Sequence, residues 1–252
     1  MTVTHLLRQE DRDAPASTAR AVDVASPNRM KCVRRCMRRG ERLYGAGDVS
    51  FMLYVVRVGV LKSCILSNDG LIQVTGFPMA GDAVGLDGVS TGLHQNTVVA
   101  LEDAEVFVLP FAQWERWARG SADGQHLMMR TLAQEIIRSQ EQALMIGVMR
   151  AEQRVAAFLL DLSARYQRLG YSPSSFVLRM TRHDIGSFLG LKLETVSRLL
   201  SRLHHEGLIQ IQGKVVGLLD LPALWRLSGL APDGRRHALD SILDREGELP
   251  AM

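Results

Sequence analysis

The arrangement of hydrophobic residues changes character along the chain. Between residues 40 and 110, short segments rich in β-branched residues alternate with glycines, and Asn68-Asp69-Gly70 is a strong signal for a hairpin turn. Short strands separated by glycine-containing turns are typical of an antiparallel barrel, roll or sandwich. We expect strands at residues 53–56, 58–66, 71–77, 97–101 and 105–109.

A helical period replaces the strand pattern after residue 111. Residues 124–148 contain no proline, and a seam recurs along them at alternating spacings of three and four residues: Met129, Leu132, Ile136, Ser139, Ala143 and Ile146. The seam fits either a helix packed on its own barrel or a two-fold coiled coil. We favour the coiled coil, because a second apolar set is available to contact the barrel: Leu127, Met128, Ile137, Leu144 and Met145.

The next part of the chain shows the pattern of a winged helix-turn-helix. An amphipathic helix at 151–169 precedes a short strand at 176–180. Thr181, with Asp184 three residues later, predicts the start of a second helix, and Gly190 permits a tight turn into a third helix at 193–205. A two-stranded ribbon at 208–219, turning at Gly213-Lys214, completes the unit.

The composition is that of a globular protein, because 46% of the 252 residues are hydrophobic and 23% are charged. No apolar run approaches the roughly 20 residues of a membrane-spanning helix, and we expect neither a secretory leader nor a membrane partner. Three cysteines do not make a disulfide scaffold, which favours a reducing cytoplasm. The net charge is only +3, but residues 149–213 hold nine Lys and Arg against five Asp and Glu, a local excess that favours a nucleic-acid partner.

The helix predicted at 193–205 carries the candidate site. Its apolar side would pack inward through Val196, Leu199, Leu200 and Leu203, which leaves Glu194, Ser197 and Arg198 on or near the opposite side. A carboxylate can accept from the cytosine amino group, a guanidinium can bind guanine O6 and N7, and a hydroxyl suits several base edges. Residues suited to contacts with phosphate, or to setting the register, are Thr181, Arg182, Lys192, Thr195, Arg202 and Lys214. The competing interpretation is an ordinary helical hairpin with solvated charges.

Three segments of the chain carry a resemblance to a known family: Glu194-x-x-Ser197-Arg198, Gly76-Phe-x-x-x-Gly-Asp-x-Val-Gly85 and Ala151-Glu-x-Arg-Val-Ala-Ala-Phe158. They resemble the CRP/FNR family of bacterial transcription regulators, and its FNR branch in particular. The resemblance implies an α+β fold with an N-terminal double-stranded β-roll of the cyclic-nucleotide-binding type, a long dimerisation helix and a C-terminal winged helix-turn-helix. It also implies a homodimer on a double-stranded TTGAT-N4-ATCAA-like palindrome, in which Arg198 reads G and Glu194 the paired C, with RNA polymerase as a second partner.

The domain boundaries follow from these patterns. We expect a disordered arm at 1–30, a β-roll sensory domain at 31–123, a dimerisation helix at 124–148, a winged helix-turn-helix at 149–222 and a tail at 223–252. The chain contains none of the common nucleotide-binding, hydrolase or metalloprotease motifs, so we do not expect an enzyme. The competing function is a sensory or protein-interaction module whose helix-turn-helix is only structural. A steep salt dependence of duplex binding distinguishes the two.

The chain departs from the oxygen-sensing members of the FNR branch, which hold an iron–sulfur cluster through cysteines in the N-terminal arm and one in the roll. No cysteine precedes residue 31, and Phe107 stands where the roll ligand is expected. Cys32, Cys36 and Cys64 do not match the spacing of the ligand set, so we expect no cluster. Cys32 and Cys36 lie beside five basic residues and could act as redox-active thiols; ordinary reduced cysteines are the competing interpretation.

Two other effectors are disfavoured, and no cofactor is expected. Relatives that bind cyclic AMP hold its phosphate with an Arg-Ser/Thr pair after a Gly-Glu pair. Here Gly81-Asp82 and Gln95-Asn96 stand in those places, and neither supplies a cation. For haem, His94 and His126 are the available ligands, and we interpret both as surface histidines.

Overall fold

The computed structural model describes residues 32–67 and 69–230, and the chain divides into two compact units between Glu141 and Gln142. The arm expected at 1–30 and the end of the expected tail, residues 231–252, lie outside the described residues. Within the described ranges, none of the helices combines the length and the apolar character needed to cross a membrane.

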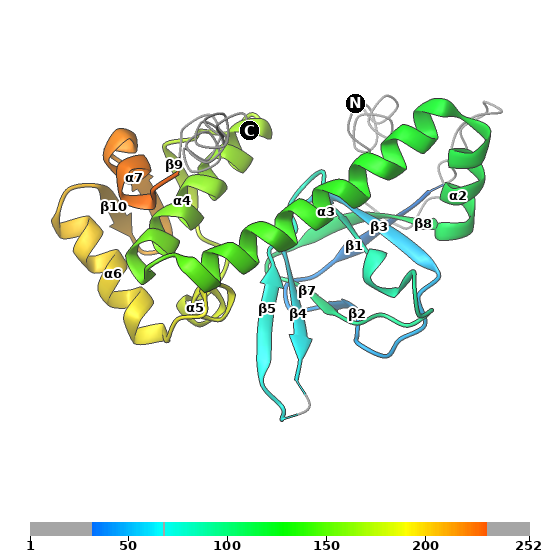
Figure 1. Cartoon of the computed structure of the whole chain (residues 1–252), viewed down its shortest axis with the longest axis horizontal. Coiled ribbons are helices and arrows are strands. Elements are labelled where there is room, and N and C mark those ends of the chain that lie inside the picture. The colour runs from blue at the N-terminus through cyan, green and yellow to red at the C-terminus, as the bar shows by residue number, and fades with distance from the viewer. Residues whose placement is uncertain (1–31, 68, 231–252) are drawn as a thin grey trace, which may run out of the picture. The chain divides into compact units, whose positions relative to one another are not determined.

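Two four-stranded antiparallel sheets form the β-roll of the first unit (Figure 1). The strand orders are β1-β8-β3-β6 and β2-β7-β4-β5. The strands are β1 (Val33–Met37), β2 (Arg42–Tyr44), β3 (Met52–Val58), β4 (Leu61–Leu66), β5 (Ile72–Gly76), β6 (Ala83–Val84), β7 (Thr97–Ala100) and β8 (Ala104–Pro110). The short helix η1 (Leu86–Gly88) follows β6, and α2 (Phe111–Gly120) and α3 (Ala122–Val148) follow β8. The predicted β-roll is therefore confirmed.

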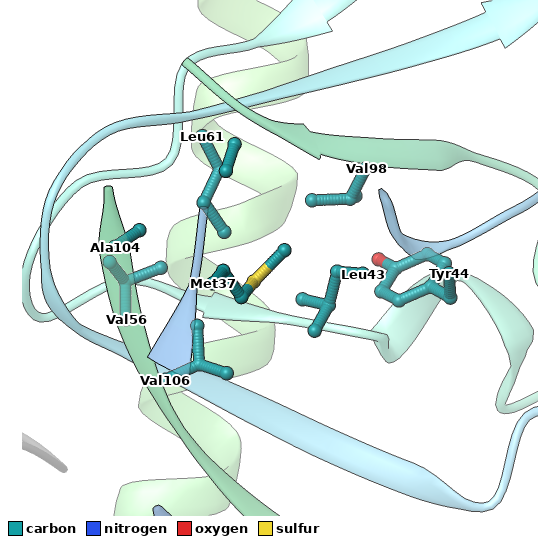
Figure 2. Close-up of a cluster of buried hydrophobic side chains, with 9 residues drawn as sticks. Met37, Leu43, Tyr44, Val56, Leu61, Val98, Ala104 and Val106 are labelled. Carbon is teal, nitrogen blue, oxygen red and sulfur yellow. The ribbon is translucent and has the colours of Figure 1, made fainter. Parts of the chain in front are cut away.

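The core of the roll lies between its two sheets (Figure 2). Successive side chains of a strand point to opposite faces, so Ala104 and Val106 of β8 enter this core whereas Phe107 and Leu109 leave it. The buried members of the cluster are Met37, Leu43, Tyr44, Val56, Leu61, Val98, Ala100, Ala104 and Val106.

The outer face of the first sheet is buried as well. Phe107 packs in a second cluster with Trp114 of α2 and Leu127 of α3, and all three side chains are buried. Since both faces of β8 are covered, its sequence is an almost continuous apolar run rather than an alternating one. The same contact fixes one face of α3 against the roll.

The boundary between the two strands predicted at 53–56 and 58–66 lies further along the chain than expected. The run expected at 58–66 is interrupted by Gly59, whose φ of 92° disfavours other residues. A Cβ atom at this position would lie 2.8 Å from the Cβ of Ala104, so the backbone makes a close approach there. The turn separates β3, which ends at Val58, from β4, which begins at Leu61.

The second unit contains the end of α3 and the predicted winged helix-turn-helix. Its elements are α4 (Ala151–Arg168), β9 (Ser175–Val177), α5 (Arg182–Leu189), α6 (Leu193–His205), β10 (Ile209–Gln212), β11 (Val215–Leu218) and α7 (Leu221–Ser228). The strand order β10-β11-β9 shows that the predicted two-stranded ribbon gains β9 as a third strand. α4 is central, because its predicted apolar face is buried: Val155, Phe158, Leu159 and Leu162.

The predicted start of the tail at residue 223 is wrong. Residues 221–228 form α7, which packs against α4, and Leu224 is completely buried. The side chain of Asp220 caps this helix by accepting a hydrogen bond from the backbone N–H of Ala223 at 2.9 Å. A single short helix carries too few turns for its apolar period to stand out, which is why the pattern was missed.

Candidate DNA-binding site

The first helix of the helix-turn-helix is started by a reciprocal cap. The Thr181 hydroxyl accepts a hydrogen bond from the backbone N–H of Asp184 at 3.1 Å. The Asp184 carboxylate accepts one from the backbone N–H of Thr181 at 2.9 Å. These bonds satisfy two N–H groups that a helix end would otherwise leave without partners. The predicted capping box is confirmed, although an aspartate replaces the usual Glu or Gln.

The turn between α5 and α6 depends on two glycines. Gly190 ends α5 with a φ of 64°, in the left-handed region, and lies at the tight turn that the sequence predicts. Gly186 was not singled out: a Cβ atom there would lie 2.6 Å from the carbonyl oxygen of Leu191. The N–H of Leu191 donates to the carbonyl of Gly186 at 2.8 Å, so the turn folds back directly onto α5.

α6 has a buried apolar side and an exposed polar side, as predicted. Val196, Leu200 and Leu203 are buried, and Leu199 is half-buried. On the other side Glu194 and Arg198 are exposed one turn apart, and Ser197 lies between them, half-buried. Neither Glu194 nor Arg198 forms an ion pair or a side-chain hydrogen bond with another residue of the described part of the chain. Both side chains are therefore available to an external partner.

Arg202 differs from Arg198 although both lie on α6. Its guanidinium forms ion pairs with Glu206 at 2.8 Å and with Glu152 of α4 at 3.5 Å. A phosphate contact by Arg202 would have to compete with two carboxylates. In the structure Arg202 links α6 to α4. These ion pairs weigh against the phosphate contact that the sequence predicts for it.

The remaining predicted phosphate-contacting residues surround the helix-turn-helix. Lys192 is exposed immediately before α6, Thr195 is half-buried in its first turn, and Lys214 is exposed in the turn between β10 and β11. Arg182, at the start of α5, is half-buried, and burial lowers the pKa of its guanidinium. Among the described residues its Nη1 has no hydrogen-bond partner, which leaves a poorly solvated cation beside the first turn of α5.

Within the β-roll, Asp87 collects four hydrogen-bond donors. Its carboxylate accepts from the backbone N–H groups of Gln95 and Asn96, both at 2.8 Å, and lies 3.2 Å from Nδ1 of His94 and 3.3 Å from the hydroxyl of Tyr44. Burial, followed by the negative charge of Asp87, raises the pKa of Tyr44, so its hydroxyl stays protonated and donates. Sequence reasoning missed this cluster, because Asp87 stands in a glycine-rich loop without a local signal.

The prediction that His94 lies on the surface is wrong. The side chain is almost completely buried, and its ring stacks on Tyr44 with ring centroids 3.7 Å apart. Its Nδ1 faces Asp87. The residue is therefore a packed and hydrogen-bonded part of the roll rather than a free ligand, whereas His126 is exposed on α3 as expected.

The roll fits a cyclic nucleotide poorly. The N–H groups of Gln95 and Asn96, which could bind a phosphodiester, already donate to Asp87. Asp82 forms an ion pair with Arg138 of α3 beside a hollow of about 30 Å³, which is room for one or two water molecules. Arg130, also on the edge of this hollow, is exposed. Among the described residues, neither the occupied N–H groups nor this hollow fits a cyclic nucleotide.

The three cysteines are not brought together as a cluster site. Cys36 on β1 and Cys64 on β4 belong to different sheets, and Phe107 is buried in the apolar cluster under α2 and α3. Cys32 packs against that same cluster, and burial raises the pKa of its thiol, contrary to the lowered pKa considered for a redox switch. Within residues 32–67 and 69–230, no three His, Cys, Asp or Glu side chains are grouped so that they could hold a metal ion.

α3 exposes the seam predicted for dimerisation. Met129 is 63% exposed and Ile136 59% exposed, whereas Leu127, on the other face, is buried against the roll. The other seam residues, Leu132, Ser139, Ala143 and Ile146, are exposed too. Ile137, which was expected to contact the barrel, is 52% exposed and widens the apolar stripe. A stripe of this size on a monomer indicates an interaction surface.

A β-roll, a long helix with an exposed apolar stripe and a winged helix-turn-helix with free polar side chains define a DNA-binding transcription regulator. Comparisons with known proteins agree. A model of the Crp-like helix-turn-helix domain matches residues 153–227, and one of the cyclic nucleotide-binding domain matches residues 34–120. The chain belongs to the CRP/FNR family of transcription regulators.

Individual relatives support this membership. The chain is 44% identical over 215 residues to the transcriptional regulatory protein btr of Bordetella pertussis, which covers 85% of this chain and 87% of btr. It is 38% identical to the fumarate and nitrate reduction regulatory protein of Escherichia coli over 196 residues, 78% of each chain. The structure of FixK2 from Bradyrhizobium japonicum matches with a TM-score of 0.73 at 30% identity, over 79% of this chain and 98% of that one. The btr protein and the fumarate and nitrate reduction protein are both named as regulatory proteins.

Proposed function

We propose that this regulator binds a TTGAT-N4-ATCAA-like palindrome as a homodimer and reads each half-site with α6. The observation that carries the proposal is the pair of exposed side chains Glu194 and Arg198 on successive turns of that helix, neither of which has a side-chain partner within residues 32–67 and 69–230. In the proposed complex the Arg198 fork binds O6 and N7 of guanine, and Glu194 accepts from the amino group of the paired cytosine. Ser197, between them, contacts a neighbouring base edge.

Contacts with the phosphate backbone set the register of α6 in the groove. The candidates are Thr181, Arg182, Lys192, Thr195 and Lys214, which lie at the two helix starts and at the wing turn. Lys192 and Lys214 are the most accessible of them, because both are exposed, whereas Nη1 of Arg182 is buried and its side chain would have to turn outward to bind a phosphate. Arg202 is left out, because Glu152 and Glu206 already bind it.

The homodimer is proposed from the exposed seam of α3. Pairing this stripe with the same stripe of a second copy would bury Met129, Leu132 and Ile136, which water surrounds in the single chain. Ser139, the polar member, is uncharged, so two copies meet there without repulsion. We infer that dimerisation needs no effector. Two copies present two recognition helices, and a palindrome matches this symmetry.

The proposed regulator uses neither an iron–sulfur cluster, nor cyclic AMP, nor haem. The reasons are the separation of Cys36 from Cys64, the occupation of the Gln95 and Asn96 N–H groups by Asp87, and the packing of His94. RNA polymerase is proposed as the second partner, as expected for a transcription regulator of this family. Iron and sulfide analysis of anaerobically purified protein tests the first of these points, and a stoichiometric cluster would contradict it.

Selection from a random duplex library tests the proposed function. The reduced, ligand-free protein should enrich a palindrome whose half-sites are about one helical turn apart, with G·C pairs at mirrored positions. Binding to the selected duplex should weaken steeply with added salt, because contacts with phosphate release counterions. Enrichment of no palindrome, together with a flat salt dependence, would favour an interaction module whose helix-turn-helix is only structural.

A further inference from the structure

Arg154 holds three backbone carbonyl groups, one in the last turn of α3, one in the link between α3 and α4, and one at the end of α5. Its Nη2 donates to the carbonyl of Ile146 at 2.6 Å, its Nε to that of Met149 at 2.8 Å, and its Nη1 to that of Leu189 at 2.9 Å. Arg154 itself lies in the first turn of α4. Ile146 lies in the last turn of α3, Met149 lies in the link between α3 and α4, and Leu189 is the last residue of α5. All of these residues belong to the second unit.

The contacts satisfy groups that helices leave open. The last four carbonyls of an α-helix have no partner within the helix, and they form its negative end. A guanidinium is planar, always charged and carries five N–H donors in a fixed fork, so one side chain can serve carbonyls from several directions. Hydrogen bonds from a charged donor are roughly twice as strong as neutral ones. Arg154 therefore joins the end of α3 to the end of α5 through α4.

The turn of the helix-turn-helix packs directly on this joint. A Cβ atom at Gly190 would lie 3.3 Å from Nη1 of Arg154 and 3.5 Å from the side chain of Ile146. The residue that follows α5 is thus in close contact both with the arginine and with the end of the dimerisation helix. We call the set Ile146, Met149, Arg154, Leu189 and Gly190 the hinge clamp.

We propose that Arg154 is a positioning residue that fixes the helix-turn-helix to the end of α3 and thereby sets the separation of the two recognition helices. The inference rests on the proposed homodimer. Arg154 acts through this position and does not itself contact DNA. In a dimer, binding of the second half-site is intramolecular, and its effective concentration depends on how well the geometry of the two heads matches the site. Loosening the clamp lowers the effective concentration for binding the second half-site, but it leaves the contacts with each half-site intact.

The test compares Arg154→Met with wild type on two duplexes, one with the full palindrome and one with a single half-site. Met keeps an apolar stem and removes all donors. We expect about a tenfold loss of affinity for the full palindrome, weaker discrimination against spacers one base pair longer or shorter, and unchanged half-site affinity. The matched control is Arg168→Met, because Arg168 lies on the same helix and its guanidinium bonds to the carbonyl of Ala164 within that helix. The control should bind as wild type does.

Arg154→Lys keeps the charge but not the fork, and it covers the case in which Arg154→Met does not fold. It should show the same selective loss on the full palindrome, to a smaller degree. Equal losses on both duplexes, or wild-type spacer discrimination in a folded Arg154→Lys protein, would overturn the proposal.

Hydrogen–deuterium exchange without DNA separates the clamp from the proposed function. Exchange across residues 146–149 and 189–192 should be faster in both Arg154 variants and unchanged in Arg168→Met. This result does not depend on dimeric DNA binding. Unchanged exchange in the Arg154 variants would overturn the clamp. A wild-type protein that binds the palindrome no better than a half-site, with faster exchange in the variants, would overturn the proposed dimeric function instead.

Discussion

The carboxylate of Asp87 accepts a hydrogen bond from the backbone N–H of Gln95 at 2.8 Å, and this bond joins η1 to the loop before β7. The same carboxylate binds the N–H of Asn96 and faces His94 and Tyr44. An internal anion therefore occupies the donors that a bound phosphodiester would need.

Asp87→Ala should lower the free energy of unfolding by about 2–3 kcal/mol, because it leaves several partly buried donors without an acceptor. Urea unfolding measures the change. Asp69→Ala, in the exposed turn between β4 and β5, is the matched control and should change stability by less than about 0.5 kcal/mol. An Asp87→Ala protein as stable as wild type would contradict the structural role given to the carboxylate.

Millimolar cyclic AMP should leave the melting temperature of the wild-type protein unchanged. A ligand that binds only the folded state raises stability by mass action, so even modest affinity would become visible at this concentration. Differential scanning calorimetry with and without the nucleotide checks the prediction. An upward shift that saturates with nucleotide concentration would show that the Asp87 cluster rearranges to admit a ligand.

Arg198→Ala should weaken binding to the palindrome by about 1–3 kcal/mol per half-site and relax discrimination at one G·C pair. Arg202→Ala is the matched comparison on the same helix, and its discrimination should equal that of wild type, because Arg202 is paired with Glu152 and Glu206. Titrations at several salt concentrations distinguish the two roles. If Arg202→Ala lowers the salt slope by about one, Arg202 contacts phosphate after all.

Ile136→Glu should convert the dimer to a monomer, because two like charges would meet in the α3 seam with no partner. Sedimentation should show wild type near twice the chain mass of 27.9 kDa and the variant near that mass. Ile136 is 59% exposed in the single chain, so the variant should still fold. Ile72→Glu, at an equally exposed position on β5, is the control and should remain dimeric. A monomeric wild-type protein at micromolar concentration would refute dimerisation through the α3 seam.

Cys36 should react with iodoacetamide faster than Cys32 in the folded protein. Cys36 is exposed, whereas Cys32 is partly buried and burial raises its pKa, which leaves less thiolate at neutral pH. A strand advances about 3.3 Å per residue, so the two Cα atoms are roughly 13 Å apart and too distant for a disulfide within the chain. Peptide mass spectrometry after alkylation and after mild oxidation tests both points. A Cys32–Cys36 disulfide in folded protein would contradict the extended geometry of this segment.

The sequence alone determined the order of the domains, the helices of the helix-turn-helix and the location of the recognition helix. The capping box of Thr181 and Asp184, the left-handed turn at Gly190 and the apolar period of α6 act within a few residues of each other. Such local signals do not depend on the rest of the fold, and the structure reproduces them. The two faces of α3 could be separated for the same reason, except that Ile137 lies on the exposed side.

The tertiary structure decided which side chains are free and which are paired. The sequence predicts a DNA contact for both Arg198 and Arg202, yet only Arg202 meets Glu152 on another helix. Tyr44 and Asp87 lie 43 residues apart, and Arg154 and Leu189 lie 35 apart, so no local period links them. Hydrogen bonds and ion pairs depend on atoms within a few ångströms of each other. Tertiary packing brings those atoms together, and the local sequence pattern does not show which distant residues will meet.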